Sequence, residues 1–127
     1  MTTFGAEIPF VDHCAIEEIG LFEGRKRLRM PLQPFHGNNM GIVHGGAICT
    51  LLDVAMGTVA RTHVGRPVMT LDMQVQFLAP GQGVLVGEGR IVRAGRSLLF
   101  CEAEVRAEET GELVARSTGL FKPSRAG

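Results

Sequence analysis

The chain has 127 residues, enough for one domain with a core of its own and too few for two ordinary domains. Its 13 basic and 13 acidic residues cancel, so net charge gives no general reason to bind nucleic acid or an anionic membrane. No uncharged apolar run approaches the roughly 18 residues of a membrane span, the amino terminus lacks a signal-peptide pattern, and three widely spaced cysteines predict no disulfide framework. We therefore expect a single cytoplasmic domain over residues 1–127, with its core at about 20–122.

The amino-terminal third is predicted to contain one strand and to lead into a long helix. A short helix is expected at about 10–16. Charged side chains alternate over residues 20–32, which predicts one strand with one solvated face. The Pro-, Gly- and Asn-rich sequence PFHGNNMG then predicts an irregular loop. A helix follows, beginning at the His-Gly-Gly of residues 44–46 and ending near 61–65 at the stop signal GRP.

The rest of the chain is predicted to be strand. Residues 68–79 alternate, with Thr70 among the polar side chains of one face and Met69, Met73 and Phe77 on the other. Further strands are expected at 84–93, 97–107 and 112–121, the last two joined by the turn EETG. The order β-α-β-β-β-β predicts an α+β fold in which the apolar stripe of the helix covers an antiparallel sheet.

One carboxylate stands alone in the predicted helix. Between Gly41 and Ala60 there is no other acidic residue and no Lys or Arg besides Asp53. At about 100° per residue, Asp53 lies opposite the apolar stripe. Its neighbours on that face are small: Gly46, Cys49, Thr50, Gly57 and Ala60. A solvated mid-helix Asp is one interpretation, but an unpaired carboxylate kept from water is costly and typical of functional sites.

The start of the helix is a second candidate feature. Its first N–H groups have no intrahelical acceptor, and at Gly45 and Gly46 no Cβ hinders a ligand oxygen, which makes it a candidate oxyanion site. Taken alone, a glycine pair that merely permits a tight turn is the better interpretation. Asp53 lies eight residues further on, about 12 Å along the axis, too far to act on the same carbonyl. Two helices packed antiparallel would bring Gly45 of one copy to Asp53 of the other, which predicts an obligate homodimer with shared sites.

These residues carry a resemblance to a known family. The string NNMGIVHGGAICTLLD, residues 38–53, resembles the N-x-x-G-x-x-H-G-G-x6-D signature of hotdog-fold acyl-CoA thioesterases, in the branch with the phenylacetate-pathway (PaaI-type) enzymes. The similarity continues through LDMQVQFLAPG (71–81), R-x-G-R-S (93–97) and the closing hairpin. It implies a long helix wrapped by a curved antiparallel sheet, dimers that often pair into homotetramers, and hydrolysis of acyl- or aryl-CoA without a metal or organic cofactor.

The resemblance also implies roles by position. Gly45, beside Gly46, would polarise the thioester carbonyl, and Asp53 of the opposing subunit would be the nucleophile or the general base. Asn38 and His44 would orient the loop, the carbonyl or the water, and Thr70 would place a hydroxyl near the attacking group. The turn that meets the CoA arm would comprise Arg93, Arg96 and Ser97.

Several alternatives remain open. Asn38 can instead hold the loop together, and Arg93 and Arg96 can be ordinary solvated turn charges. His44 can cap the helix or pack rather than catalyse, and Thr70 can be an ordinary strand residue. The chain could be a non-catalytic acyl-CoA-binding module, or an enoyl- or hydroxyacyl-thioester (de)hydratase; the latter usually uses a His as its base, whereas here Asp occupies the middle of the helix. The other histidines lack the spacing of a zinc site, and no G-x-S-x-G elbow is present. The sequence does not distinguish aryl from alkyl substrates.

Overall fold

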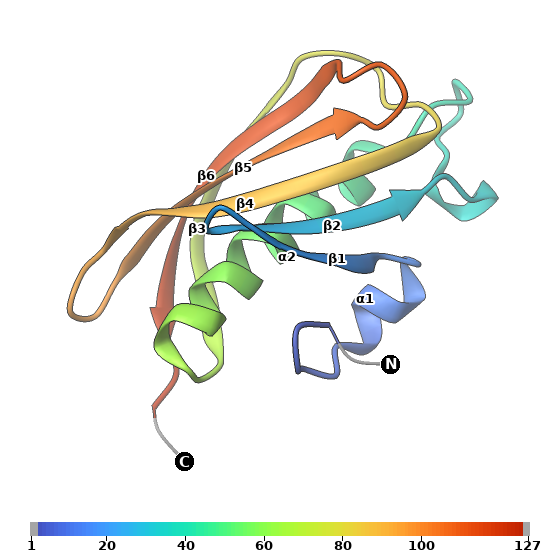
Figure 1. Ribbon diagram of the computed structural model, residues 1–127. Helices are drawn as coiled ribbons and strands as arrows, with labels where there is room; N and C mark the ends of the chain where they lie inside the picture. The colour runs from blue at the N-terminus through green and yellow to red at the C-terminus, as the bar shows by residue number, and fades with distance from the viewer. Residues whose placement is uncertain (1–2, 126–127) are drawn as a thin grey trace.

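A computed structural model describes residues 3–125 as one long helix lying across a six-stranded antiparallel sheet (Figure 1). The long helix is α2 (Gly45–Val64), and the sheet order is β1-β2-β4-β5-β6-β3. This confirms the predicted α+β architecture. No helix of the described chain is both long and apolar enough to cross a membrane. The remaining elements are α1 (Pro9–His13), β1 (Glu17–Phe22), β2 (Arg25–Pro31), the 3-10 helix η1 (Pro34–His36), β3 (Val68–Phe77), β4 (Val84–Ala94), β5 (Leu99–Ala107) and β6 (Leu113–Pro123).

The prediction of a single strand before the long helix was wrong. Residues 20–32 are divided between β1 and β2, which form a hairpin in which Phe22 pairs with Arg25. The two residues between them, Glu23 and Gly24, both have positive φ, 51° and 78°. A two-residue hairpin turn of this kind requires positive φ at both positions. Glu is uncommon at such a position, so Glu23 carried no signal of a turn. The alternation of charged residues therefore continued through the turn without an obvious break.

The core lies between α2 and the inner face of the sheet. The predicted apolar stripe of the helix is confirmed, since all of its members are buried: Ile48, Leu51, Leu52, Ala55 and Val59. The helix lies very close to β4, where an ideal Cβ on Gly89 would stand 2.3 Å from the backbone oxygen of Ala55. Gly65, with φ 74°, ends the helix in the left-handed conformation at the predicted place.

A buried histidine connects the amino-terminal segment to the loop before α2. His36 is only 2% exposed. Its Nδ1 accepts a hydrogen bond from the backbone N–H of Gln33 at 2.9 Å, so the proton is on Nε2, which donates to the carbonyl of Cys14 at 2.6 Å. The backbone oxygen of His36 in turn accepts the N–H of His44. This side chain therefore helps to fix the loop that leads to the helix start.

Replacing His36 with alanine is expected to lower the free energy of unfolding by about 1–3 kcal/mol, because it leaves the buried carbonyl of Cys14 and the half-buried N–H of Gln33 without this partner. Denaturant unfolding of the purified variant measures the loss. The matched control is His63→Ala, since His63 is exposed on the last turn of α2 and its removal should change stability by no more than about 0.5 kcal/mol. Equal stability of the two variants would contradict the structural role of His36.

Candidate functional site

The Asp53 carboxylate is held by a hydroxyl from the neighbouring edge strand. Asp53 is half-buried in the middle of α2, and its Oδ1 accepts a hydrogen bond from Thr70 Oγ1 of β3 at 2.7 Å. Both residues line a cavity of about 360 Å³ between α2, β3 and the amino-terminal segment. The hydrogen bond leaves the second carboxylate oxygen, Oδ2, available to a water molecule or a substrate.

Thr70 reaches Asp53 because β3 contains a bulge. Thr70 pairs with Phe121 of β6, but Asp72 pairs with Leu120, so Leu71 is an extra residue in the ladder. Since Phe121 is buried beneath the helix, its partner Thr70 also faces the helix. The predicted alternation placed Thr70 opposite Met73 and Phe77, and this is wrong. The extra residue changes the alternation and brings Thr70 to the inner face.

The helix start presents one free backbone donor. His44 is the N-cap of α2, and its Nδ1 accepts the N–H of Gly46 at 2.8 Å. The imidazole is therefore unprotonated at Nδ1 and orients the first turn, as expected of a capping residue. Among residues 3–125, the N–H of Gly45 has no hydrogen-bond acceptor. The free donor at the helix start is thus Gly45, whereas the N–H of Gly46 is already occupied.

Asn38 organises the loop in front of this donor. Its Oδ1 accepts hydrogen bonds from the N–H groups of Met40 and Ile42, at 2.8 and 3.3 Å, and its own N–H donates to the oxygen of Ile42. This geometry corresponds to the loop-holding alternative for Asn38. Asn38 and Gly45 line one cavity of about 380 Å³, together with the ring of Phe77.

Within one chain, the Asp53 cavity and the Gly45 cavity are separate. They share no lining residue. The eight-residue separation along α2 corresponds to about 12 Å. The structure therefore brings Asp53 together with Thr70, and Gly45 together with Asn38 and His44, but it does not bring these two groups into one site.

Comparison with known proteins identifies the family. The sequence pattern that defines the Thioesterase superfamily matches residues 40–114, more than half of the chain. The chain belongs to this superfamily. The matched segment includes α2, with both Gly45 and Asp53, and the strands β3, β4 and β5.

Several proteins similar to this chain support the assignment. Mouse acyl-coenzyme A thioesterase 13 is 29% identical over 92 residues, covering 68% of this chain and 64% of that protein. The crystal structure of BH2602 from Bacillus halodurans with CoA has a TM-score of 0.86 and 31% identity, with 95% of this chain and 82% of that chain covered. E. coli PaaI shows the shared hotdog fold. Its structure has a TM-score of 0.87 and 19% identity, with 94% of this chain and 87% of that chain covered. The chain spans about three fifths of the length of the curated relatives that it matches first, 60% and 64%.

The residues expected to meet CoA lie apart from both cavities. Arg93 is near the end of β4, and Arg96 and Ser97 are in the turn to β5, a hairpin that extends beyond the end of the helix (Figure 1). All three are exposed. In the described part of the chain, neither arginine forms an ion pair or lines the cavity of Asp53 or of Gly45. Their role remains a prediction.

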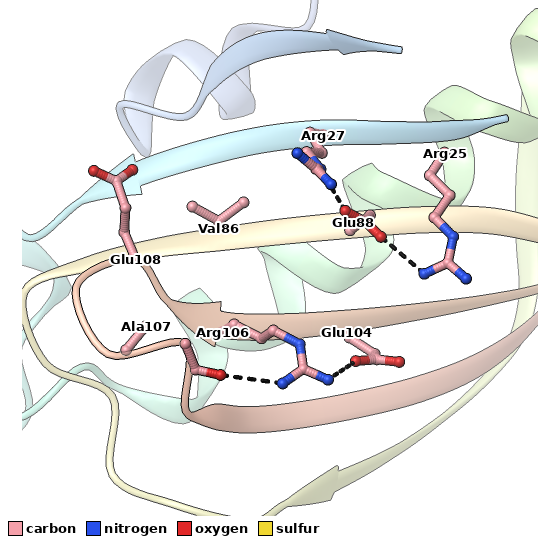
Figure 2. A pocket seen from close by; sticks show the side chains of 9 residues that line it. Arg25, Arg27, Val86, Glu88, Glu104, Arg106, Ala107 and Glu108 are labelled. Atoms are coloured by element: carbon pink, nitrogen blue, oxygen red, sulfur yellow. Dashed lines mark hydrogen bonds and ion pairs between the residues drawn. The ribbon is translucent and has the colours of Figure 1, made fainter. Parts of the chain in front are cut away.

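In a charged cavity on the outer face of the sheet, every lining arginine is ion-paired within the described residues. Figure 2 shows the Glu88 carboxylate between Arg25 and Arg27, and the Arg106 guanidinium between Glu104 and a backbone carbonyl. Burial raises the pKa of the Glu88 carboxyl, but the hydrogen bonds from the two arginines outweigh this and hold its pKa below the ordinary value. The contribution of these hydrogen bonds to the free energy of unfolding is therefore present near neutral pH. It is lost as the pH falls through the lowered pKa of Glu88. This cavity is an ion-paired surface, and we assign it no ligand.

Sequence reasoning missed the other end of the Asp53 cavity. Arg61 of α2 lines it, as do residues of the amino-terminal segment that include Ala6 and Ile8. A signal was present for Arg61, since Asp53, Gly57 and Arg61 are four residues apart in turn and so share one face of the helix. The amino-terminal wall had no such signal, because its position depends on contacts between residues far apart in the sequence.

Proposed function

We propose that this protein hydrolyses acyl-CoA thioesters to a free acid and CoA, as a homodimer whose two sites each combine Asp53 of one subunit with Gly45 of the other. The observation that carries the proposal is the Asp53 carboxylate, hydrogen-bonded by Thr70 and placed in a largely apolar cavity. Membership of the Thioesterase superfamily supports it, as do the named activity of acyl-coenzyme A thioesterase 13 and the CoA bound to BH2602.

The proposed chemistry needs only these side chains and the helix start. Asp53 attacks the thioester carbonyl directly, or its free Oδ2 takes a proton from a water molecule that attacks. The negative charge that develops on the carbonyl oxygen is stabilised by the N–H of Gly45 at the positive end of the helix dipole. The carbon–sulfur bond then breaks, and CoA leaves as a thiolate that takes up a proton. On the direct route, a water molecule then hydrolyses the anhydride formed on Asp53, which releases the free acid and restores the carboxylate.

The edge of the sheet supports the proposed dimer. β3 is an edge strand, and its apolar side chains are each about half exposed: Met69, Leu71, Phe77 and, just beyond it, Leu78. An exposed apolar edge strand is a template for pairing with another strand. Antiparallel pairing of two β3 strands about a two-fold axis runs the two α2 helices in opposite directions, as the shared site requires. Pairing of two dimers into a tetramer rests on the resemblance alone. Sedimentation analysis measures the oligomeric state and so tests both the dimer and the tetramer.

The decisive experiment measures release of free CoA thiol from a panel of aliphatic and aromatic acyl-CoAs. We expect turnover of at least one member, and no thiol release from any member would refute the proposal. The three cysteines, Cys14, Cys49 and Cys101, are all free thiols, in keeping with the reducing cytoplasm that we propose as the location. Burial raises the pKa of the Cys101 thiol to about 11, so it adds little background to a thiol assay.

Replacing Thr70 with valine is expected to lower kcat/KM about 10-fold, since a hydrogen bond to a charged group is worth about 1.5–3 kcal/mol and part of it is lost here. Thr70→Ser keeps the hydroxyl and should keep most of the activity. Steady-state rates on the best acyl-CoA of the panel measure both. The control is Thr118→Val, on the exposed outer face of β6. If Thr70→Val and Thr118→Val retain equal activity, Thr70 has no role in positioning Asp53.

A further inference from the structure

The cavity that contains Asp53 extends along α2 to a second charged side chain. Asp53, Gly57 and Arg61 all line it and follow one another at intervals of one helical turn. Arg61 therefore lies about 12 Å beyond Asp53 along the helix axis. Because Gly57 has no side chain, the space between the two charged residues stays open. The cavity thus has a reactive end at Asp53 and a cationic end at Arg61.

The walls between these two ends are mainly apolar. They are formed by Ile8, Val54, Val68 and the ring of Phe121. Such walls match a hydrocarbon chain and offer nothing to the phosphates or the adenine of CoA. The part of the cavity beyond Asp53 is therefore suited to the acyl group of a substrate rather than to its CoA part.

Arg61 has hydrogen-bonding capacity that the described residues do not use. One terminal nitrogen donates to the backbone oxygens of Phe4 and Thr3. Its Nε–H is buried and has no hydrogen-bond partner within the described residues. An unpaired buried donor of this kind costs about 1–3 kcal/mol, which a shift of the guanidinium towards a ligand oxygen in the cavity would recover.

Arg61 has no ion-pair partner among the described residues, although the carboxylates of Glu7 and Glu18 lie in this part of the molecule. Glu7 lines the same cavity and is exposed. Lys26 is a second cation nearby, buried with its ammonium 3.9 Å from the centre of the Phe4 ring. Burial lowers the pKa of Lys26, the charge of Glu18 raises it, and the charge of Arg61 lowers it again. Glu18, whose Oε2 accepts the N–H of Phe4, offsets the charge of Lys26, so the cation that the far end of the cavity presents is the Arg61 guanidinium itself.

We infer that Arg61 binds the far end of the acyl group, and that the preferred substrates are ω-carboxyacyl-CoA thioesters, whose free carboxylate accepts hydrogen bonds from its guanidinium. This inference rests on the proposed thioesterase function. A site built to hydrogen-bond a substrate group discriminates strongly against the analogue that lacks it, because the protein donor is then left unpaired. The separation of Asp53 and Arg61 also requires a chain long enough to reach both.

The test compares acyl-CoAs of equal length that differ only at the far end. Adipoyl-CoA is paired with hexanoyl-CoA and suberoyl-CoA with octanoyl-CoA, on the wild-type protein. We expect kcat/KM to be about 10-fold or more higher for the carboxylate member of at least one pair. Faster hydrolysis of the methyl-ended member in both pairs would overturn the inference while leaving the proposed function intact. Absence of hydrolysis of every acyl-CoA would instead refute the proposed function itself.

Variants of Arg61 then assign the preference to one side chain. Arg61→Met should abolish or invert the preference within a pair, with its main effect on the carboxylate member. An equal loss on both members would place Arg61 on the CoA side or in a purely structural role, and would overturn the assignment. The matched control is Arg66→Met, which removes an exposed arginine just beyond α2 and should leave the preference unchanged. Circular dichroism and thermal unfolding establish that each variant is folded; if Arg61→Met is not, the wild-type pairs alone decide.

Discussion

Replacement of Asp53 by asparagine is expected to lower kcat/KM by about 100-fold or more, because the amide can neither accept a proton nor attack the thioester. The exchange keeps the size of the side chain and its ability to accept the hydrogen bond of Thr70, so the fold should be retained. Steady-state hydrolysis of the best acyl-CoA measures the loss. The matched control is Asp72→Asn, because Asp72 lies on the outer face of β3, close in sequence to Thr70 but away from Asp53.

Subunit mixing tests whether this carboxylate acts in a shared site. Gly45→Pro removes the N–H at the helix start that has no acceptor among the described residues, and proline is well tolerated at the first position of a helix. Each variant alone should be nearly inactive. After the two are unfolded together and refolded, about half of the dimers contain one intact site, so about one quarter of the wild-type activity should return. If the mixture stays inactive while mixed dimers form, Asp53 and Gly45 do not act across the interface. For the single variant, an Asp53→Asn activity within a few-fold of wild type would refute the mechanism itself.

Replacement of Gly89 by alanine should be among the most destabilising single changes in the chain. The new Cβ would lie 2.3 Å from the oxygen and 2.5 Å from the carbonyl carbon of Ala55, both of which belong to the backbone of α2. A helix backbone cannot rotate out of the way as a side chain can, so the helix and the sheet must separate. We expect a loss of about 3 kcal/mol or more in the free energy of unfolding, at the upper end for overpacked cores.

Gly87 provides the internal comparison, on the same strand and the same face. A Cβ at Gly87 would meet the side chain of Leu51, with its Cγ at 2.8 Å, and this side chain can change its rotamer. Gly87→Ala should therefore cost less than Gly89→Ala when both are measured by denaturant unfolding. Equal costs would show that the distance between the helix backbone and β4 does not limit the fold.

Most of the fold could be predicted from the sequence because its signals are local. Three signals can each be read from residues close together in the chain. They are the glycines at the ends of the long helix, its apolar stripe and the alternation of the later strands. The missed strand had a local cause as well, a turn with Glu23 in an unfavourable conformation. The place of the hairpin in the sheet is set by the pairing of β2 with β4, and a single segment of sequence does not reveal that pairing.

The candidate site was predictable in its residues but not in its arrangement. The composition of α2 singled out Asp53, and the glycines at its start singled out Gly45. The contact between Asp53 and Thr70 was not predictable, since it depends on an extra residue in β3 that only the pairing with β6 reveals. The same is true of the cavity end at Arg61, because the segment that closes it is far away in the sequence.

The bulge at Leu71 makes the partner of Asp53 depend on chain length as well as on residue identity. A protein of this fold with one residue fewer at this point could keep a threonine in the matching place and still turn its hydroxyl to the outer face. A single insertion or deletion in an edge strand is thus enough to gain or lose this hydroxyl in evolution. Comparisons between relatives should therefore align β3 by its pairing partners in β6, and only then compare the side chains beside the carboxylate.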